Sequence, residues 1–363
     1  MRTRALAAVL VATLVAAGCA GPQGPTPVAF TKIDLAGAPV TLTPVGESLL
    51  VGVRRDGQPV VPALLRRDPG GAVTEVPATP ATPYGNLARW TQVDTDGTRL
   101  YAVGGERGGA HGNVRWSAWD GTASGVVEKR QAFSTFGGYG AGDLVGVVVT
   151  PSTPAIVGNW ENPTGGFDIA TWLPVGDDWI RQPSAGTALE ASRDALPFPI
   201  AATRFGAGIM VVGWQFANGR EEPVTWHSTT GVTGWTKTPL PAPSPGAAMS
   251  VHCDQSDCYA AGRLNGSLAL WHLTGDAWTL LPDTPNYPVT DKDVLPAPVP
   301  TPTGVLQLVS EGDTLKALHH TTTWTVHTIT GPTGKPTAAV AIGPTLHAVV
   351  GDRLWTAELD SLR

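Results

Sequence analysis

Three polar stretches, residues 105–113, 159–167 and 215–222, combine charged and aromatic side chains that can bind or transform a polar ligand. Their candidate ligand-binding residues are Glu106, Arg107, His111, Trp160, Glu161, Arg220, Glu221 and Glu222. A Trp face stacks on sugars or apolar groups, while Arg and Glu supply directed hydrogen bonds. If two of the four glutamates converge, they have the chemistry of an exported hydrolase or lyase acting on a carbohydrate. The plain alternative is that these stretches are surface loops, which are polar because water solvates them.

Motifs for other chemistries are absent from the sequence. It contains no glycine-rich phosphate loop, no serine nucleophile elbow and no zinc signature. His319 and His320 fall on a predicted strand, so their rings point to opposite sides of the sheet and cannot share a metal ion. We therefore predict no metal site, no cofactor and no catalytic residue, which favours a binding protein over an enzyme.

The elements that must position the polar stretches form an internal repeat. An apolar run ending in Val-Gly or Ala-Gly, followed by a polar turn, recurs along the chain. The run ends at Gly52, Gly104, Gly158, Gly213, Gly262 and Gly351, and a degenerate copy ends at Ser310. The intervals between them are 52, 54, 55, 49, 48 and 41 residues, and no long helical pattern lies between them. Such a period is typical of proteins built from stacked or radial repeats.

Each repeat is predicted to contain four short strands. In the fourth repeat these are residues 200–204, 209–214, 224–227 and 235–238. A Trp on the third strand is followed, across a tight polar turn, by a Trp that opens the fourth. The clearest pairs are Trp172 and Trp179, Trp226 and Trp235, and Trp271 and Trp278. Seven units of this kind predict an all-β, seven-bladed β-propeller in which these Trp residues pack between neighbouring blades.

The two ends of the chain indicate how the ring closes. The last repeat supplies only three strands, near residues 337–342, 346–350 and 354–358. Residues 29–35 alternate like a strand, so we expect them to complete the last blade and hide two sheet edges. The propeller domain is then residues 29–363. The polar stretches join second to third strands, which places them on adjacent blades over one mouth of the channel.

The composition limits the partners. Hydrophobic residues make up 42% of the chain and charged residues 15%, so there is ample apolar surface to bury. The net charge is −6 and the isoelectric point is near 5.7. An acidic protein of this kind is not expected to bind nucleic acid as its main role.

Cysteine usage indicates an oxidising compartment. Cys253 and Cys258 flank a short polar segment that suits a hairpin turn, and outside the cytoplasm such a pair is expected to form a disulfide. A zinc site is the more specific alternative, but the sequence lacks a second pair of cysteines to complete it. Free thiols are the remaining alternative.

The N-terminus has the pattern of an export signal. Arg2 and Arg4 precede an apolar stretch, residues 5–16, that is too short for a membrane span. The ending Ala-Ala-Gly before Cys19 resembles the lipobox of bacterial lipoproteins, although Ala replaces its usual first Leu. The resemblance implies a signal peptide, residues 1–18, and acyl chains such as palmitate on Cys19, with residues 19–28 as a tether. An ordinary secretory signal and a retained helix are the alternatives.

The turns before the fourth strands resemble those of the Asp-box propellers, the sialidase-like group. Ser228, Thr230, Val232 and Trp235 occupy the frame of that box, but only Ser and Trp match it. The box is structural in that family and implies fold, not activity. The sialidase arrangement of three Arg residues with a Tyr nucleophile is not recognisable here. The segment from Cys253 to Cys258 also resembles segments of extracytoplasmic bacterial propellers, where such a cysteine pair joins the first two strands of a blade.

These observations predict a lipoprotein on the extracytoplasmic face of the cell membrane. The lipid on Cys19 would anchor a propeller that binds or scaffolds a protein, peptide or glycan without catalysis. An exported carbohydrate-active hydrolase or lyase is the rival. A third possibility is a subunit of an envelope complex, which would show a broad apolar patch on one face.

Overall fold

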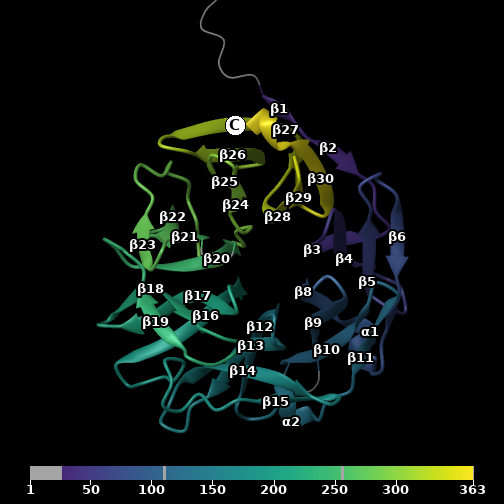
Figure 1. Cartoon of the computed structure of the whole chain (residues 1–363), viewed down its shortest axis with the longest axis vertical. Coiled ribbons are helices and arrows are strands. Elements are labelled where there is room, and N and C mark those ends of the chain that lie inside the picture. The colour runs from purple at the N-terminus through teal and green to yellow at the C-terminus, as the bar shows by residue number, and fades with distance from the viewer. Residues whose placement is uncertain (1–26, 109–111, 255–256, 363) are drawn as a thin grey trace, which may run out of the picture.

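Seven sheets stand in a ring around a central axis in the computed structural model, which describes residues 27–108, 112–254 and 257–362 (Figure 1). The first strand of each blade lies nearest the axis and the fourth lies at the rim (Figure 1). The protein is therefore the predicted seven-bladed β-propeller. Among the described residues, no helix is long and apolar enough to cross a membrane.

The first four blades follow one another along the chain. Their strands are β3 (Ala38–Val45), β4 (Ser48–Arg54), β5 (Pro62–Arg67) and β6 (Val73–Val76); β8 (Arg89–Thr95), β9 (Arg99–Arg107), β10 (Val114–Thr122) and β11 (Gly125–Lys129); β12 (Ala141–Val149), β13 (Pro154–Glu161), β14 (Phe167–Val175) and β15 (Asp178–Arg181); and β16 (Ala195–Phe205), β17 (Gly208–Ala217), β18 (Arg220–His227) and β19 (Thr236–Pro239). A short strand, β7 (Ala78–Thr79), adds in parallel to the rim of blade two.

The last three blades complete the ring. Their strands are β20 (Gly246–Asp254), β21 (Asp257–Leu264), β22 (Ser267–Thr274) and β23 (Ala277–Leu280); β24 (Val299–Thr301), β25 (Gly304–Glu311), β26 (Thr314–His320) and β27 (Trp324–Thr333); and β28 (Pro336–Ile342), β29 (Thr345–Val350), β30 (Arg353–Glu358) and β2 (Thr31–Ile33). Two short helices, α1 (Pro83–Leu87) and α2 (Phe133–Phe136), lie in the links on either side of blade two, and η1 (Leu359–Leu362) ends the described chain.

The repeated glycine has a packing reason. In blades one to five it lies on the second strand, opposite a bulge in the first strand of the same blade. A Cβ at Gly213 would lie 2.1 Å from the Phe198 carbonyl oxygen, and one at Gly262 would lie 2.0 Å from that of Ala247. Only glycine lets the bulged strand approach this closely.

The third-strand tryptophans form the core between blades, as predicted. Trp119, Trp172, Trp226 and Trp271 are all fully buried. Two of them also fix the link that leads into their own blade, because the Trp172 Nε1 donates to the Thr135 carbonyl at 3.0 Å and the Trp271 Nε1 to that of Pro241 at 2.8 Å. The repeated Trp residues of the third strands therefore have a structural role.

The N-terminal strand closes the ring. Strand β2 pairs with β30, with Thr31 opposite Thr356, which confirms the expected completion of the last blade. A second short strand, β1 (Val28–Ala29), pairs in parallel with β27 of blade six, which the sequence did not predict. Phe30, between the two strands, is buried in the core shared by blades six and seven. The N-terminus thus joins two blades.

The predicted disulfide is present between Cys253 and Cys258, with a Cα–Cα distance of 4.1 Å. It joins β20 to β21 next to their turn, where the two residues lie directly opposite each other. Cys19, the signal peptide at residues 1–18 and nearly all of the tether lie outside the described residues.

Candidate binding face

One face of the ring carries both the turns between second and third strands and the links between blades; we call it the link face. Both kinds of connection emerge there because the strands of a blade alternate in direction. The predicted ligand-binding residues that the structure describes all lie at this face, at the ends of β9 and β13 and at the start of β18. His111 lies outside the described residues.

The sequence predicts long loops for these residues, whereas the structure places them on strands. Strand β9 runs to Arg107, β13 runs to Glu161 and β18 begins at Arg220. The turn before Arg220 is only Asn218–Gly219, with φ of 55° and 75°. This is the geometry of a two-residue hairpin turn. The strands continue past the apolar part of the sequence pattern, so the pattern alone predicts loops for these polar segments.

Three of the four predicted carboxylates are held by cations and amides. Glu106 pairs with Arg89 at 2.8 Å, and Glu221 pairs with Arg263 of the next blade at 2.7 Å. Glu222 accepts hydrogen bonds from Gln215, Asn218 and Arg220, and the Gln215 bond contributes most to lowering the Glu222 pKa. These contacts suit fixed ion pairs and turns better than proton transfer.

Trp160 is packed against its own blade. The Arg181 guanidinium lies 4.7 Å from its ring centre, and the ring meets Trp172 edge-on at 6.2 Å. A Cβ at Gly140 would lie 2.6 Å from the Trp160 Nε1, so the link after α2 covers that edge. Trp160 is half-buried. Its neighbour Glu161 is exposed, and the Glu161 N–H donates to the Gly140 carbonyl at 2.8 Å.

Exposed aromatic side chains gather on the link face. In the described part of the chain, five aromatic residues are exposed, and all five lie at this face, on blades two to four or the links beside them. They are Tyr84, Phe133, Tyr139, Phe167 and Phe216, which we call the aromatic arc. Exposed aromatic groups confined to one face are typical of an interaction surface. The arc lies on the same three blades as the predicted residues.

A cleft of about 400 Å³ lies over blade two between the two short helices; we call it the α1–α2 cleft. Tyr84 and Phe133 line it from opposite helices, and Trp116 and Phe136 contribute apolar surface. The Arg115 guanidinium lies between the two helices, 4.8 Å from the Phe133 ring centre and 5.7 Å from that of Tyr84. A mostly apolar cleft with a few polar groups is the usual form of a small ligand site.

Buried polar contacts fix the α1 side of this cleft. Glu128, which is buried, accepts hydrogen bonds from the Ala81 N–H at 2.6 Å, the Thr82 N–H at 2.7 Å and the Thr82 hydroxyl at 2.7 Å. Thr82 in turn caps α1 by accepting from the Gly85 N–H at 2.9 Å. A carboxylate with three donors holds the link firmly on blade two.

A side-chain amide fixes the α2 side. The Gln131 Oε1 accepts from the Trp179 N–H at 2.9 Å, and the Gln131 Nε2 donates to the Asp177 carbonyl at 2.8 Å. Trp179 and Asp177 both belong to blade three. Gln131 therefore ties the link between blades two and three to blade three. The two helices therefore stand on fixed supports, and the cleft between them is preformed.

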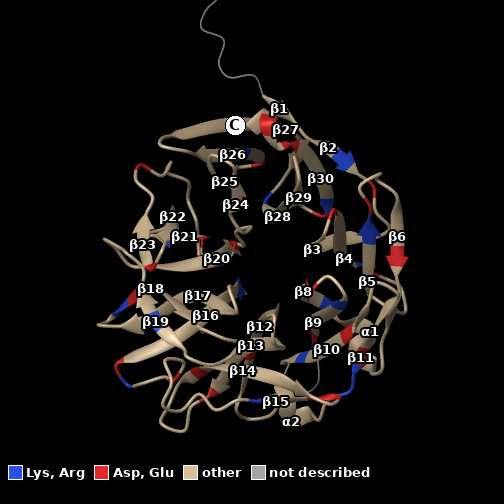
Figure 2. Ribbon diagram, in the orientation of Figure 1, with Lys and Arg blue, Asp and Glu red and all other residues tan. Residues whose placement is uncertain are grey.

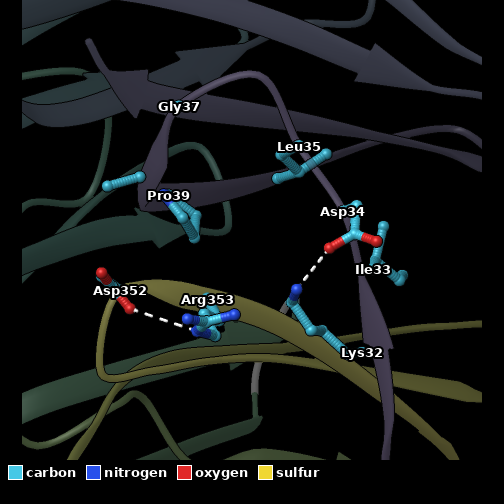
Figure 3. Close-up of a pocket in the computed structure, with 9 residues that line it drawn as sticks. Lys32, Ile33, Asp34, Leu35, Gly37, Pro39, Asp352 and Arg353 are labelled. Atoms are coloured by element: carbon cyan, nitrogen blue, oxygen red, sulfur yellow. Dashed lines mark ion pairs between the residues drawn. The ribbon is translucent and has the colours of Figure 1, made fainter.

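A smaller cavity of about 210 Å³ lies at the seam where the ring closes (Figure 3). The segment from Lys32 to Pro39 forms one side, and Asp352 with Arg353 forms the other (Figure 3). Lys32 pairs with Asp34, and Arg353 pairs with Asp352 at 3.6 Å. Because its charges are paired, the seam offers less to a ligand than the α1–α2 cleft. Figure 2 shows basic and acidic residues interspersed around the whole ring.

Among the described residues, Asp94 is the carboxyl group whose pKa is raised. Burial raises its pKa to about 6 against the opposing effect of two hydrogen bonds. The Asp94 carboxylate accepts from the Val149 N–H of blade three at 2.7 Å and from the Thr95 N–H at 2.8 Å. Asp94 lies near the end of β8, away from the link face, so it joins two blades and does not contribute to the cleft.

The residues that form the cleft were not predicted from the sequence. The polar pattern points to the turns between second and third strands, whereas Tyr84 and Phe133 of the cleft, and Tyr139 of the arc, lie in links between blades. A signal was present, because Tyr84 stands between a Pro and a Gly and Tyr139 follows two glycines. Aromatic residues in such turn-forming segments have no strand on which to be buried. Arg115 gave no signal, since its aromatic neighbours come from separate links.

Comparison with known proteins supports the propeller fold but identifies no family and no activity. No protein-family model and no curated protein matches the chain. Among solved structures it is similar to a puromycin hydrolase complexed with PGG, with a TM-score of 0.57 and 15% identity over 90% of this chain and 53% of that one. This chain therefore spans about half the length of that hydrolase.

Two further structures match over nearly their whole length. Virginiamycin B lyase from Staphylococcus aureus, with quinupristin, gives a TM-score of 0.52 and 12% identity over 90% of this chain and 98% of that one. The β-propeller domain of the Trilobed protease from Pyrococcus furiosus gives 0.51 and 10% over 88% and 95%. At these identities the likenesses support the propeller fold alone.

Proposed function

We propose that this protein is a non-catalytic binding propeller, anchored to the extracytoplasmic face of a membrane, whose link face takes a protein, peptide or glycan. The observation that carries the proposal is the aromatic arc. Its five side chains are exposed on one face, where each leaves apolar surface in water that a ligand would cover. The fixed α1–α2 cleft lies within the same region.

The contacts of the glutamates favour binding over the rival hydrolase or lyase. Glu106, Glu221 and Glu222 are each engaged by a neighbouring cation, which leaves the exposed Glu161 without a second free carboxylate among the predicted residues. An acid–base pair needs one carboxyl group that is free to give or take a proton at the reacting atom. The solved structures that resemble this fold include enzymes, but the fold by itself does not carry their chemistry.

The binding proposal is tested by changing the arc alone. We expect that the triple variant Phe133→Ser, Tyr139→Ser, Phe167→Ser loses the partner that chemical cross-linking joins to the wild-type protein in intact membranes. The matched control is Val73→Ser, Val127→Ser, Ile180→Ser, because these exposed apolar residues lie on rim strands. Equal cross-linking by both triple variants would contradict the proposal.

The membrane anchor is a separate part of the proposal. It is supported by the lipobox-like residues before Cys19 and by the disulfide, which suits an oxidising compartment. Two or three acyl chains, at ~0.8 kcal/mol for each buried methylene, would hold the protein on a bilayer. We expect Cys19→Ala to lose radiolabelled palmitate and to leave the membrane fraction. A variant that stays membrane-bound would show that a lipid on Cys19 is not the anchor.

We also propose that the blade-four turn is a degenerate Asp-box with a structural role. Two contacts support it: the Ser228 hydroxyl donates to the Gly231 carbonyl, and the Trp235 Nε1 donates to the Val232 carbonyl at 2.7 Å. Both bonds lie within the turn and neither reaches the link face. The expected effect of Ser228→Ala is therefore a loss of stability, measured by urea unfolding, without a change in cross-linking to the partner.

A further inference from the structure

Arg115 is a cation without a counter-charge. In the described ranges no Asp or Glu pairs with it, and its Nε is buried without a hydrogen-bond partner. Glu106 lies opposite it across β9 and β10, but the Glu106 carboxylate contacts Arg89 and the Arg107 N–H instead. We propose that Arg115 is the receptor for the terminal carboxylate of a peptide chain bound in the α1–α2 cleft. This inference rests on the proposed binding function.

The two rings beside Arg115 prepare it for this role. Phe133 and Tyr84 lie on separate helices, and each is within 6 Å of the guanidinium carbon. Stacking of this kind restricts the rotamers of a long side chain, so less freedom is lost when a ligand binds. A planar guanidinium held in place presents paired N–H groups that match the two oxygens of a carboxylate.

The other polar groups of the cleft are already engaged. Glu128 is satisfied by three donors, and Lys129 pairs with Asp177 at 2.8 Å. The Ser117 hydroxyl donates to the Gly104 carbonyl and accepts from the Trp119 Nε1. A neutral glycan needs many free donors and acceptors, and this cleft has few to offer. One anionic group on an apolar body is the better match.

The apolar surface of the cleft suits the last side chain of a peptide. Trp116 and Phe136 provide it, within a volume of about 400 Å³. The arc continues beyond the cleft to Tyr139, so the preceding peptide residues would find further aromatic groups on the same face. A fatty acid shares the carboxylate and the apolar body, but its chain has no amide groups to extend along this face. We therefore commit to a peptide with an apolar C-terminal residue.

The test compares free-acid and amidated peptides. The probes are fluorescein-labelled octapeptides that end in Phe, randomised at the two preceding positions, and binding is followed by fluorescence anisotropy. We expect the wild-type protein to bind the free acids at least about tenfold more tightly than the amides, because a charge-assisted pair forms only with the acid. Arg115→Met keeps an unbranched side chain and is expected to remove this preference. The matched control, Arg130→Met, changes an exposed cation of the neighbouring link and is expected to keep it.

The outcomes separate this inference from the proposed function. Equal binding of acids and amides by the wild-type protein, or a preference that survives Arg115→Met, would overturn the carboxylate site. Binding of palmitate or an oligogalacturonate that depends on Arg115, with no binding of the peptides, would replace the peptide as occupant. In each of these cases the arc variants still decide the proposed function by cross-linking. Circular dichroism and thermal unfolding of both Met variants confirm that they are folded.

Discussion

At the scale of single residues, the charged groups of the link face differ in how they are neutralised. Glu221 and Arg263 satisfy each other across two blades, and Glu106 is satisfied by Arg89. Among the described residues, the Arg115 guanidinium contacts the Phe133 and Tyr84 rings and pairs with no carboxylate. A half-buried cation without a carboxylate costs free energy that a bound anion would recover. Arg181 at the same face also lies over an aromatic ring, but it is exposed, whereas Arg115 is half-buried in the cleft.

Titration of a buried histidine provides a prediction at this scale. Burial, assisted by the nearby Arg67, lowers the pKa of His347 from 6.5 to about 4. The unfolded chain takes up this proton below pH 6.5, whereas the folded protein stays neutral to about pH 4. The free energy of unfolding therefore falls as the pH decreases through this window, by about 3 kcal/mol for this residue. His347→Gln should remove that contribution.

The measurement is urea unfolding of the wild type and His347→Gln at several pH values between 7 and 4. Asp94 acts in the opposite sense, because its raised pKa stabilises the fold as the pH falls from about 6 towards 4. Both proteins carry Asp94, so their difference isolates His347. Parallel curves for the two proteins would show that His347 titrates alike in the folded and unfolded states.

At the scale of elements, the short helices depend on the blades below them. Helix α1 has five residues and α2 has four, so neither is stable by itself in water. Their positions come from Glu128 below α1 and from Gln131 beside α2. The aromatic walls of the cleft are therefore only as rigid as these polar contacts. The link is the unit that builds the site, and the strands are its support.

Removing one charge below α1 tests this dependence. Glu128→Gln keeps the shape of the side chain but removes its charge, and the new NH2 group replaces one of the two oxygens that accept from Thr82 and Ala81. We expect a loss of about 2 kcal/mol in the free energy of unfolding and weaker peptide binding, because Tyr84 is displaced. Urea unfolding and anisotropy measure the two effects.

The control for this prediction is Glu75→Gln. Glu75 is exposed and pairs with Arg55 at 2.9 Å on the rim of blade one, where such a pair contributes at most about 1 kcal/mol. Peptide binding should be unchanged in this variant. If the two variants behave alike, Glu128 does not hold the link, and the rigidity of the cleft must have another source.

At the scale of the whole molecule, closure depends on a few residues at the N-terminus. Strands β1 and β2 pair with blades six and seven, and the Phe30 N–H between them donates to the Thr330 carbonyl at 2.9 Å. Without these strands the edges of β27 and β30 would be open to other chains. The first described residue, Pro27, precedes β1 at this seam.

Phe30→Ala tests the closure. Phe30 is buried among residues of blades six and seven, so the variant should lose about 3 kcal/mol of stability and leave the edge of β30 accessible. Hydrogen exchange should increase first in β30, and size-exclusion chromatography should show association. Thr31→Ala, at an exposed position beside it, should do neither. Slow exchange in β30 of the Phe30→Ala variant would mean that closure does not depend on Phe30.

The number of blades, their four strands, the closure by the N-terminal segment and the disulfide were all predictable from the sequence. These features repeat locally or join neighbouring strands: a glycine opposite each bulge in the first five blades and a buried Trp on the third strand recur with the blade period. The partners of the charged and aromatic side chains, in contrast, are set by how separate elements meet in the folded protein. Arg115 meets Tyr84 and Phe133 because two links without periodicity cross one blade, and Glu221 meets Arg263 because two blades adjoin. Such contacts depend on distances between separate elements, which no local pattern in the sequence encodes.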